Sequence, residues 1–147
     1  MKFPLPAKEV VPHRGGMCCI DTLLEATSQK VIACVTLHPQ HLLLNNNTTL
    51  DRSGFIELAA QAACGLKGMG AGDKRANVTA LLGGVSHFQV FEDAKVDQTL
   101  MIYVSMSGEV AGISLLNFHI DSNERLLASG ELKVFYQAEK PGSQVTP

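Results

Sequence analysis

The chain has 147 residues, of which 46% are hydrophobic and only 18% are charged, and its formal net charge is −2. This length favours a single domain with a sizeable core, and the composition argues against intrinsic disorder. The small negative charge supplies no basic field for nucleic acid. The first residues lack the apolar stretch of a signal peptide, and no run approaches the roughly 18 apolar residues of a membrane span, so we expect a cytoplasmic protein with no nucleic-acid or membrane partner.

The first half of the chain reads as two strands, a loop and a helix. Apolar and β-branched runs predict strands at 17–26 and 31–37, separated by a turn at 27–30. A polar loop follows over 38–51, where three consecutive asparagines favour turns, and a loop of this length is often functional. A helix is predicted over 53–66, before a glycine-rich stretch that ends it.

The second half of the chain reads as four more strands. They are expected at 78–90, 99–106, 112–120 and 126–136, separated by turns that contain Asp, Gly or Asn. Residues 141–147 are expected to form a disordered tail. The prediction is therefore one domain over residues 1–140.

The helix predicted over 53–66 is apolar nearly all round and carries a single carboxylate, Glu57. Such a helix is normally buried, and burying a carboxylate without a partner costs several kcal/mol. Glu57 is therefore expected to be paired, hydrated or used in chemistry, with Gln61 one turn further on the same face. The alternative is that Glu57 points through a gap to solvent from the first turn, where the helix dipole favours a negative charge.

One buried helix and five or six strands fit few architectures. A single antiparallel sheet wrapped around a long central helix, which is the α+β hot-dog fold, would bury that helix on most sides. A ferredoxin-like sandwich is the alternative, but it needs a second helix of comparable length that the sequence does not show.

The cysteines and histidines do not form a metal motif. The four cysteines lack the paired spacing of a zinc knuckle or redox site, and the five histidines lack a helical ligand pair. Because Cys18, Cys19, Cys34 and Cys64 stand among apolar neighbours, we expect small core side chains there. No metal ion is predicted.

Three segments, in order over about residues 10–136, carry a family resemblance. They are Val11-Pro12-His13-Arg14 with a following apolar run and Asp21, the helix sequence with Glu57-x-x-x-Gln61, and Leu82-Gly83-Gly84-Val85 with the later turn at Asp97. Together they resemble the hot-dog β-hydroxyacyl-acyl-carrier-protein dehydratases of fatty acid synthesis. The resemblance implies dehydration of a β-hydroxyacyl thioester to the trans-2-enoyl thioester.

In that chemistry a base removes the proton next to the thioester carbonyl, an acid protonates the departing hydroxyl, and backbone N–H groups hold the enolate oxygen. The resemblance assigns Glu57 as the acid, a role that dry burial would favour. Gln61 is a candidate substrate-binding residue on the helix. The family's oxyanion glycine is replaced by Arg52 here, and Gly54 or the other first-turn N–H groups are the candidates to hold the enolate oxygen instead. Gly83 and Gly84 would let a thioester approach the sheet closely, or would instead mark a bulge at a bent strand.

The loop before the helix departs from the family pattern. The family carries Gly-His-Phe-Pro-Gly, whose His acts as the base fourteen places before the Glu, and this position is Leu43 here. His41, two residues away, and His38, at the end of the preceding strand, are the candidate replacements, with ordinary loop residues as the alternative. The altered loop resembles that of divergent predicted dehydratases, some of which are associated with aryl-polyene pigment pathways.

Three functions stay open on the sequence. The first is a dehydratase acting on carrier-bound β-hydroxyacyl chains, the second is a hot-dog thioesterase in which Glu57 activates water, and the third is a catalytically silent acyl-binding or partner subunit. No cofactor is expected, since the substrate is carried on phosphopantetheine. The basic residues Lys67, Lys74 and Arg75 are candidates for contact with an acyl carrier protein, or form a solvated helix end.

Contacts beyond the site are also predicted. An Arg14–Asp21 contact would pin the amino-terminal segment, and His87 and His119 would point outward from strands or be hydrogen-bonded. A lone sheet leaves unpaired edge strands, which predicts a homodimer, with higher oligomers left open. The family resemblance places the carboxylate of one subunit opposite the loop histidine of the other.

Overall fold

The computed structural model describes residues 3–7, 18–66 and 78–138. In this part of the chain, seven strands form one antiparallel sheet in the order β1-β2-β3-β7-β8-β9-β6. The strands of this sheet are β1 (Leu5–Pro6), β2 (Thr22–Ala26), β3 (Lys30–Thr36), β6 (Val78–Val90), β7 (Thr99–Val110), β8 (Ile113–Ser122) and β9 (Arg125–Ala138). A second sheet pairs β4 (Leu44–Asn45) with β5 (Thr49–Leu50).

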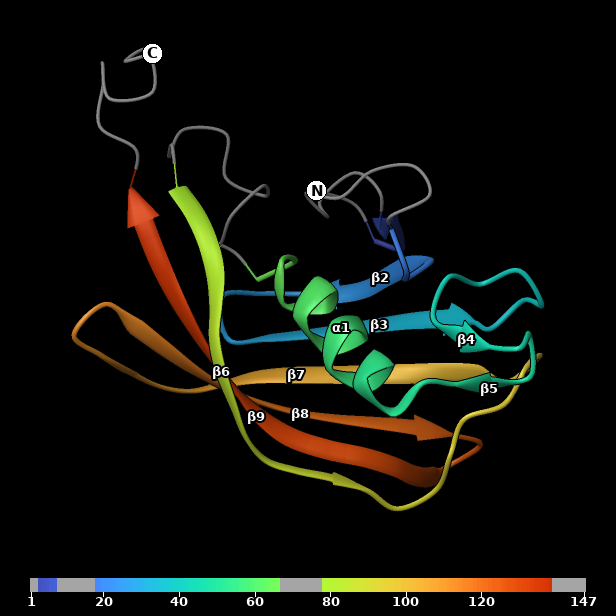
Figure 1. The fold of residues 1–147 in the computed structure, drawn as a ribbon. Coiled ribbons are helices and arrows are strands. Elements are labelled where there is room, and N and C mark those ends of the chain that lie inside the picture. Colours follow the sequence, from blue (N-terminus) through green and yellow to red (C-terminus); the bar gives the residue numbers. More distant parts are fainter. Residues whose placement is uncertain (1–2, 8–17, 67–77, 139–147) are drawn as a thin grey trace, which may run out of the picture.

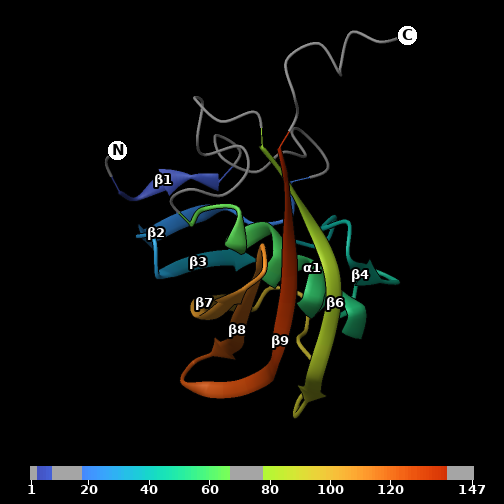
Figure 2. The same cartoon turned by 90° about the vertical axis from the view of Figure 1, so that its left-hand side faces the viewer.

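The single helix of the described residues, α1 (Arg52–Ala63), lies against one face of the curved sheet. It packs on β3, β6, β7 and β8, and Figures 1 and 2 show the long strands β6 and β9 bending around it. This arrangement confirms the predicted wrapping of an antiparallel sheet around a central helix. The second long helix that a ferredoxin-like sandwich requires does not occur in the described ranges. None of the described helical residues form a segment long and apolar enough to cross a membrane.

The strand register places the core between the sheet and the helix. Along β8, Leu116, Phe118 and Ile120 are buried, whereas the intervening Asn117 and His119 are exposed. This alternation is the period of two that a strand with one buried face requires. Together with the apolar face of α1, the inward side chains of β3, β7, β8 and β9 form one continuous core.

α1 begins at a cap that its sequence supplies. Asp51 accepts a hydrogen bond from the Ser53 N–H at 3.1 Å, which satisfies one of the unpaired donors of the first turn. The predicted helix over 53–66 is thus confirmed with slightly different ends. The residues facing the sheet, such as Phe55 and Leu58, are fully buried, but Ile56 and Glu57 on the other side are only half-buried. The helix is therefore covered on fewer sides than its composition predicts.

Two other elements differ from the sequence expectations. The first long strand starts at Thr22 rather than at residue 17. The carboxylate of Asp21, just before the strand, accepts a hydrogen bond from the Thr36 N–H at 2.9 Å. The loop over 38–51 is not wholly irregular, since it contains the β4–β5 pair. The left-handed backbone of Asn46 and Asn47 closes this short hairpin, as their residue type allows. The predicted tail at 141–147 lies outside the described residues.

Candidate functional site

α1 brings Glu57 and Gln61 together as its period requires. Gln61 is buried and donates from Nε2 to Glu57 Oε1 at 3.1 Å. The second carboxylate oxygen, Oε2, makes no hydrogen bond within the residues that the structure describes. Glu57 lies on the half-buried side of the helix.

The backbone of Cys19 links this pair to the loop before the helix. The Cys19 N–H donates to Gln61 Oε1 at 2.7 Å, and the Cys19 carbonyl lies 2.8 Å from His41 Nε2. The Leu43 N–H donates to the other ring nitrogen of His41, Nδ1, at 3.2 Å. Three of the predicted site residues, Glu57, Gln61 and His41, are thus joined through a residue that carries no sequence signal for such a role.

In this conformation both ring nitrogens of His41 are engaged. A base must offer a free lone pair, so His41 could take a proton from substrate only after one of these bonds breaks. His38 is exposed at the turn that follows β3, and its carbonyl accepts from the His41 N–H at 2.8 Å. The role of base therefore stays a prediction for His38 and His41. Leu43, at the position of the family histidine, is half-buried against the core.

The first turn of α1 already uses two of its N–H groups. Ser53 donates to the side chain of Asp51, and Gly54 donates to the Asp51 carbonyl at 2.7 Å. Gly54 is also buried, and a Cβ on it would come within 2.8 Å of a Leu50 methyl carbon. The need for glycine at this position thus follows from packing, and its N–H is occupied by the cap.

Hydrogen bonds and an ion pair hold the loop against the start of α1. Asn45 Nδ2 donates to Asp51 Oδ1 at 3.3 Å, and Arg52 pairs with Asp93 at 2.9 Å. The hydrogen bonds from Ser53 and Asn45 lower the pKa of Asp51 below its ordinary value. These contacts fix the stretch of backbone from which the family motif is missing.

Gly83 and Gly84 lie on β6, where the register with β9 shifts between Leu82 and Gly84. The bulge that was the alternative interpretation of these glycines is therefore present. The ring of Phe135 covers Gly83, because a Cβ there would be 1.8 Å from the ring, whereas a Cβ on Gly84 would meet only Lys133 at 3.8 Å. Close approach of a thioester at Gly84 stays a prediction.

The cysteine thiols near Glu57 are poor nucleophiles. Burial, reinforced by the charge of Glu57, raises the pKa of Cys64 to about 11. Burial also raises the pKa of Cys19 and of Cys34. Since the thiolate is the reactive form, the raised pKa values make these thiols unreactive. The expectation of core side chains holds for Cys19, which is buried, and Cys18 packs partly buried against the core, whereas Cys34 and Cys64 are only half-buried and lie outside it.

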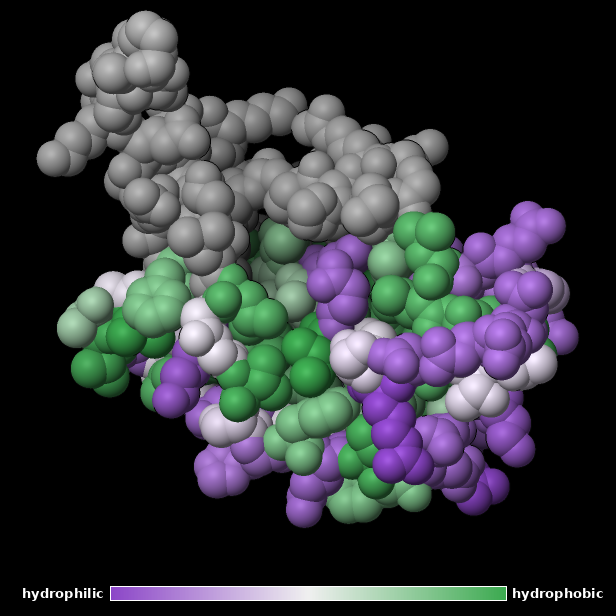
Figure 3. All heavy atoms as spheres, in the orientation of Figure 1, coloured by the Kyte–Doolittle hydropathy of each residue, from purple (hydrophilic) through white to green (hydrophobic). Residues whose placement is uncertain are grey.

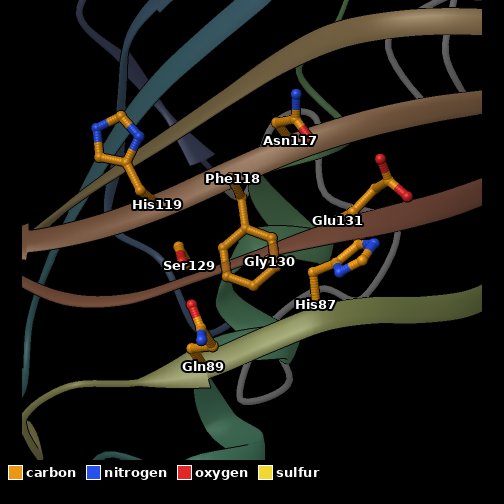
Figure 4. A pocket seen from close by; sticks show the side chains of 8 residues that line it. All are labelled: His87, Gln89, Asn117, Phe118, His119, Ser129, Gly130 and Glu131. Atoms are coloured by element: carbon orange, nitrogen blue, oxygen red, sulfur yellow. The ribbon is translucent and has the colours of Figure 1, made fainter.

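A shallow hollow of about 400 Å³ lies on the other side of the sheet, away from α1 (Figure 4). The side chains of His87 and His119 are exposed there, as their strand positions predict, and His119 stacks on Tyr103 with ring centroids 4.5 Å apart. Its lining comprises His87, Gln89, Asn117, Phe118, His119, Ser129, Gly130 and Glu131. None of the predicted site residues lies in this hollow.

Several predicted contacts fall outside the description. His13 and Arg14, and with them the Arg14–Asp21 contact, lie outside the described residues, as do Lys67, Lys74 and Arg75. Within residues 3–7, 18–66 and 78–138, no three His, Cys, Asp or Glu side chains gather as a metal site would require. The site that the structure does describe is therefore the Glu57 face of α1 and the loop beside it.

Sequence comparison matches residues 5–145 to the family described as ApeP-like, ApeP dehydratase. A comparison with curated proteins gives no match. The family match spans nearly the whole chain, including the segments of 8–17 and 67–77 that the structure leaves undescribed.

Similar solved structures share the fold. The dehydratase heterocomplex ApeI:P from Xenorhabdus doucetiae gives a TM-score of 0.77 at 17% identity, over 95% of this chain and 93% of that chain. A hypothetical thioesterase from Streptococcus pneumoniae TIGR4, solved with coenzyme A, gives 0.63 at 12% identity, over 81% and 87% of the two chains. An HP0420-homologue from Helicobacter felis gives 0.67 at 15% identity, over 92% and 88%. These likenesses confirm the hot-dog fold.

Proposed function

Because the chain belongs to the ApeP-like dehydratase family, we propose that it removes water from β-hydroxyacyl thioesters delivered by an acyl carrier protein, with Glu57 as the general acid. The products are trans-2-enoyl thioesters of a fatty-acid or aryl-polyene type of pathway. The observation that carries the proposal is the carboxylate of Glu57, held through Oε1 by Gln61 on the half-open face of α1.

The geometry of Glu57 suits proton transfer to a leaving group. One carboxyl oxygen is fixed by the buried amide of Gln61, which leaves the other oxygen for the substrate hydroxyl. Protonation of that hydroxyl lets water depart while a base takes the proton from the carbon next to the thioester carbonyl. The substrate arrives on the phosphopantetheine arm of its carrier, so the protein itself needs no cofactor for this step.

The open side of α1 and the edge of the sheet favour a dimer. β6 is an edge strand of thirteen residues, and an unpaired edge of this length normally needs a partner. The surface in Figure 3, on the side where α1 lies in front of the sheet, shows apolar side chains gathered over the helix and the bent strands. A second hot-dog subunit paired along β6 would cover both features.

The partner is proposed to be either a second copy of this chain or a different hot-dog subunit. The second alternative has a specific support here, because both ring nitrogens of His41 are engaged and Leu43 stands at the family histidine position. A different subunit could then supply the base to the site that contains Glu57. The Xenorhabdus doucetiae dehydratase of similar fold is a heterocomplex, which is consistent with such an assembly.

The experiment that tests the proposal follows two signals on carrier-bound substrates. β-Hydroxyacyl and trans-2-enoyl carriers are incubated with the protein alone and with its co-expressed hot-dog partner, while enoyl absorbance and thioester loss are recorded. A dehydratase changes the absorbance and keeps the thioester, a thioesterase destroys the thioester, and a silent subunit changes neither. Size-exclusion chromatography with light scattering gives the assembly, and a monomer under all conditions would contradict the dimer.

The variant Glu57→Gln tests the acid directly. It keeps the side-chain volume and removes the titrating group, so turnover should fall by about 10²–10⁴-fold. Glu131→Gln is the matched control, since Glu131 is a half-buried carboxylate on the far side of the sheet, bonded by Ser86 at 2.9 Å. Equal activity of the two folded variants would remove Glu57 from the mechanism.

A further inference from the structure

The backbone of a single residue, Cys19, lies between the loop before α1 and the catalytic face of α1. The Cys19 carbonyl contacts His41 Nε2 at 2.8 Å, and the Cys19 N–H donates to Gln61 Oε1 at 2.7 Å. Cys19 is 42 residues from Gln61 and 22 residues from His41 along the chain, so three separate segments meet at this point. Cys19 and Gln61 are both buried, which shields these bonds from competing water.

The partners of His41 define the protonation state of its ring. The Cys19 carbonyl can only accept, so Nε2 must carry a hydrogen. The Leu43 N–H can only donate, so Nδ1 must present its lone pair. Both contacts are satisfied by one form of the side chain, the neutral imidazole with its hydrogen on Nε2. Neither the imidazolium ion nor the other neutral form satisfies both.

The partners of Gln61 define the orientation of its amide in the same way. Its Oε1 accepts from the Cys19 N–H, which turns the Nε2 donor towards Glu57 Oε1 at 3.1 Å. The reverse orientation would oppose two N–H groups at Cys19 and two oxygens at Glu57. The Cys19 N–H therefore determines that the NH₂ end of the Gln61 amide faces Glu57.

We propose that His41 and Gln61 are positioning residues, which act in series through the backbone N–H and C=O groups of Cys19 to hold the Glu57 carboxylate in place. This inference rests on the proposed dehydratase function and adds to it a role for His41 other than that of the base. His41 binds the Cys19 carbonyl and so holds the loop at 38–43 against residue 19. Gln61 then connects the Cys19 N–H to the Glu57 carboxylate.

The proposal makes a specific demand on substitutions of His41. His41→Gln offers an amide N–H near the position of Nε2 and can still donate to the Cys19 carbonyl, but it cannot act as a general base. His41→Ala can neither donate a hydrogen bond to the Cys19 carbonyl nor act as a general base. If His41 positions Glu57, the Gln variant should recover most of the kcat that the Ala variant loses, and the loss in Ala should be about 10²-fold at most, with little change in KM.

Gln61→Leu tests the second link at constant side-chain size. It removes the contacts to both Cys19 and Glu57, and its effect on kcat should resemble that of His41→Ala. The matched control is His119→Gln, an exposed histidine on the far side of the sheet, which should leave kcat unchanged. The shape of the pH–rate profile should be the same in wild type and His41→Gln. A His41→Gln variant as inactive as His41→Ala, with its acid limb lost, would overturn the proposal in favour of the base.

A readout that needs no turnover separates this inference from the proposed function. Nitrogen-15 spectra of the histidine rings should show His41 as the neutral form with its hydrogen on Nε2 at the pH of the assay. The side-chain amide signals of Gln61 should shift in His41→Ala and stay unchanged in His119→Gln. A His41 ring protonated on Nδ1, or Gln61 signals indifferent to His41→Ala, would overturn the positioning role. If the spectra show these results but the protein turns over no hydroxyacyl carrier, the positioning role is supported and only the dehydratase function is contradicted.

Discussion

A single added methyl group at Gly130 on β9 should destabilise the fold. A Cβ at this site would lie 2.8 Å and 2.9 Å from two ring atoms of Phe118 and 3.3 Å from the Phe88 backbone. Phe118 stands opposite Gly130 in the register of β8 and β9 and is only 2% exposed. Because the core confines this ring and a backbone atom lies behind it, neither neighbour can move away.

Gly83 provides the informative contrast. A Cβ there would come closer still to a ring, 1.8 Å from Phe135, yet Phe135 is 41% exposed and can rotate into solvent. Gly84, the next residue, would meet only the flexible end of Lys133 at 3.8 Å. The loss of stability in the three substitutions should therefore depend on how freely the neighbouring side chain can move, and not on how short the Cβ contact is.

The magnitudes follow from opposing terms. Overpacking a confined core site costs about 1–3 kcal/mol, and replacing Gly by Ala regains about 0.4–1 kcal/mol through the unfolded chain. Gly130→Ala should thus lose about 1–2 kcal/mol net. Gly83→Ala should lose less than about 1 kcal/mol, and Gly84→Ala should be neutral or gain up to about 1 kcal/mol. These differences correspond to about 2–4 °C in Tm for each kcal/mol.

Urea and thermal unfolding, followed by circular dichroism, measure the free energy of unfolding of the three variants under one set of conditions. The double variant Gly130→Ala with Phe118→Leu, which removes the rigid ring, should be less destabilised than the sum of its single changes. The reasoning would be refuted by a Gly130→Ala protein as stable as Gly84→Ala, or by Gly83→Ala as the most damaging of the three. It would also be refuted by strictly additive effects at Gly130 and Phe118.

Three further predictions concern the site and its surroundings. Hydrogen bonds lower the pKa of Asp51 below 3.8. Its contribution to stability is therefore complete above that pH and is lost as the pH falls through the folded pKa. Asp51→Asn keeps the cap, so between about pH 5 and pH 2 its Tm should fall less than that of wild type. With a pKa of about 11, about one Cys64 thiol in a thousand is a thiolate at pH 8. Peptide mass spectrometry should therefore find slow alkylation of Cys64 in the folded protein and faster alkylation in urea. Equal rates in the two conditions would contradict the buried thiol. If a thioester approaches the sheet at Gly84, Gly84→Ala should raise KM without lowering Tm, and an unchanged KM would remove Gly84 from the site.

Local patterns in the sequence were sufficient for most of the elements. The apolar run with one carboxylate predicts α1 and the pair of Glu57 and Gln61, because residues four apart share a helix face whatever surrounds them. The strand-like runs at 99–106, 112–120 and 126–136, bounded by turn residues, predict β7, β8 and β9. Motif order was enough to predict the family, despite the missing histidine motif.

What only the tertiary structure decided is how distant segments meet. The backbone of Cys19 meets His41 and Gln61 across 22 and 42 residues of chain. It does so through N–H and C=O groups that no sequence pattern marks. The same is true of Gly130, whose need for glycine comes from the ring of Phe118 on the neighbouring strand of the folded sheet. Sequence determines periodicity and local hydrogen bonding because both act within a few residues. Contacts between separate segments depend on strand register and bulges, which are fixed only when the whole sheet closes around the helix.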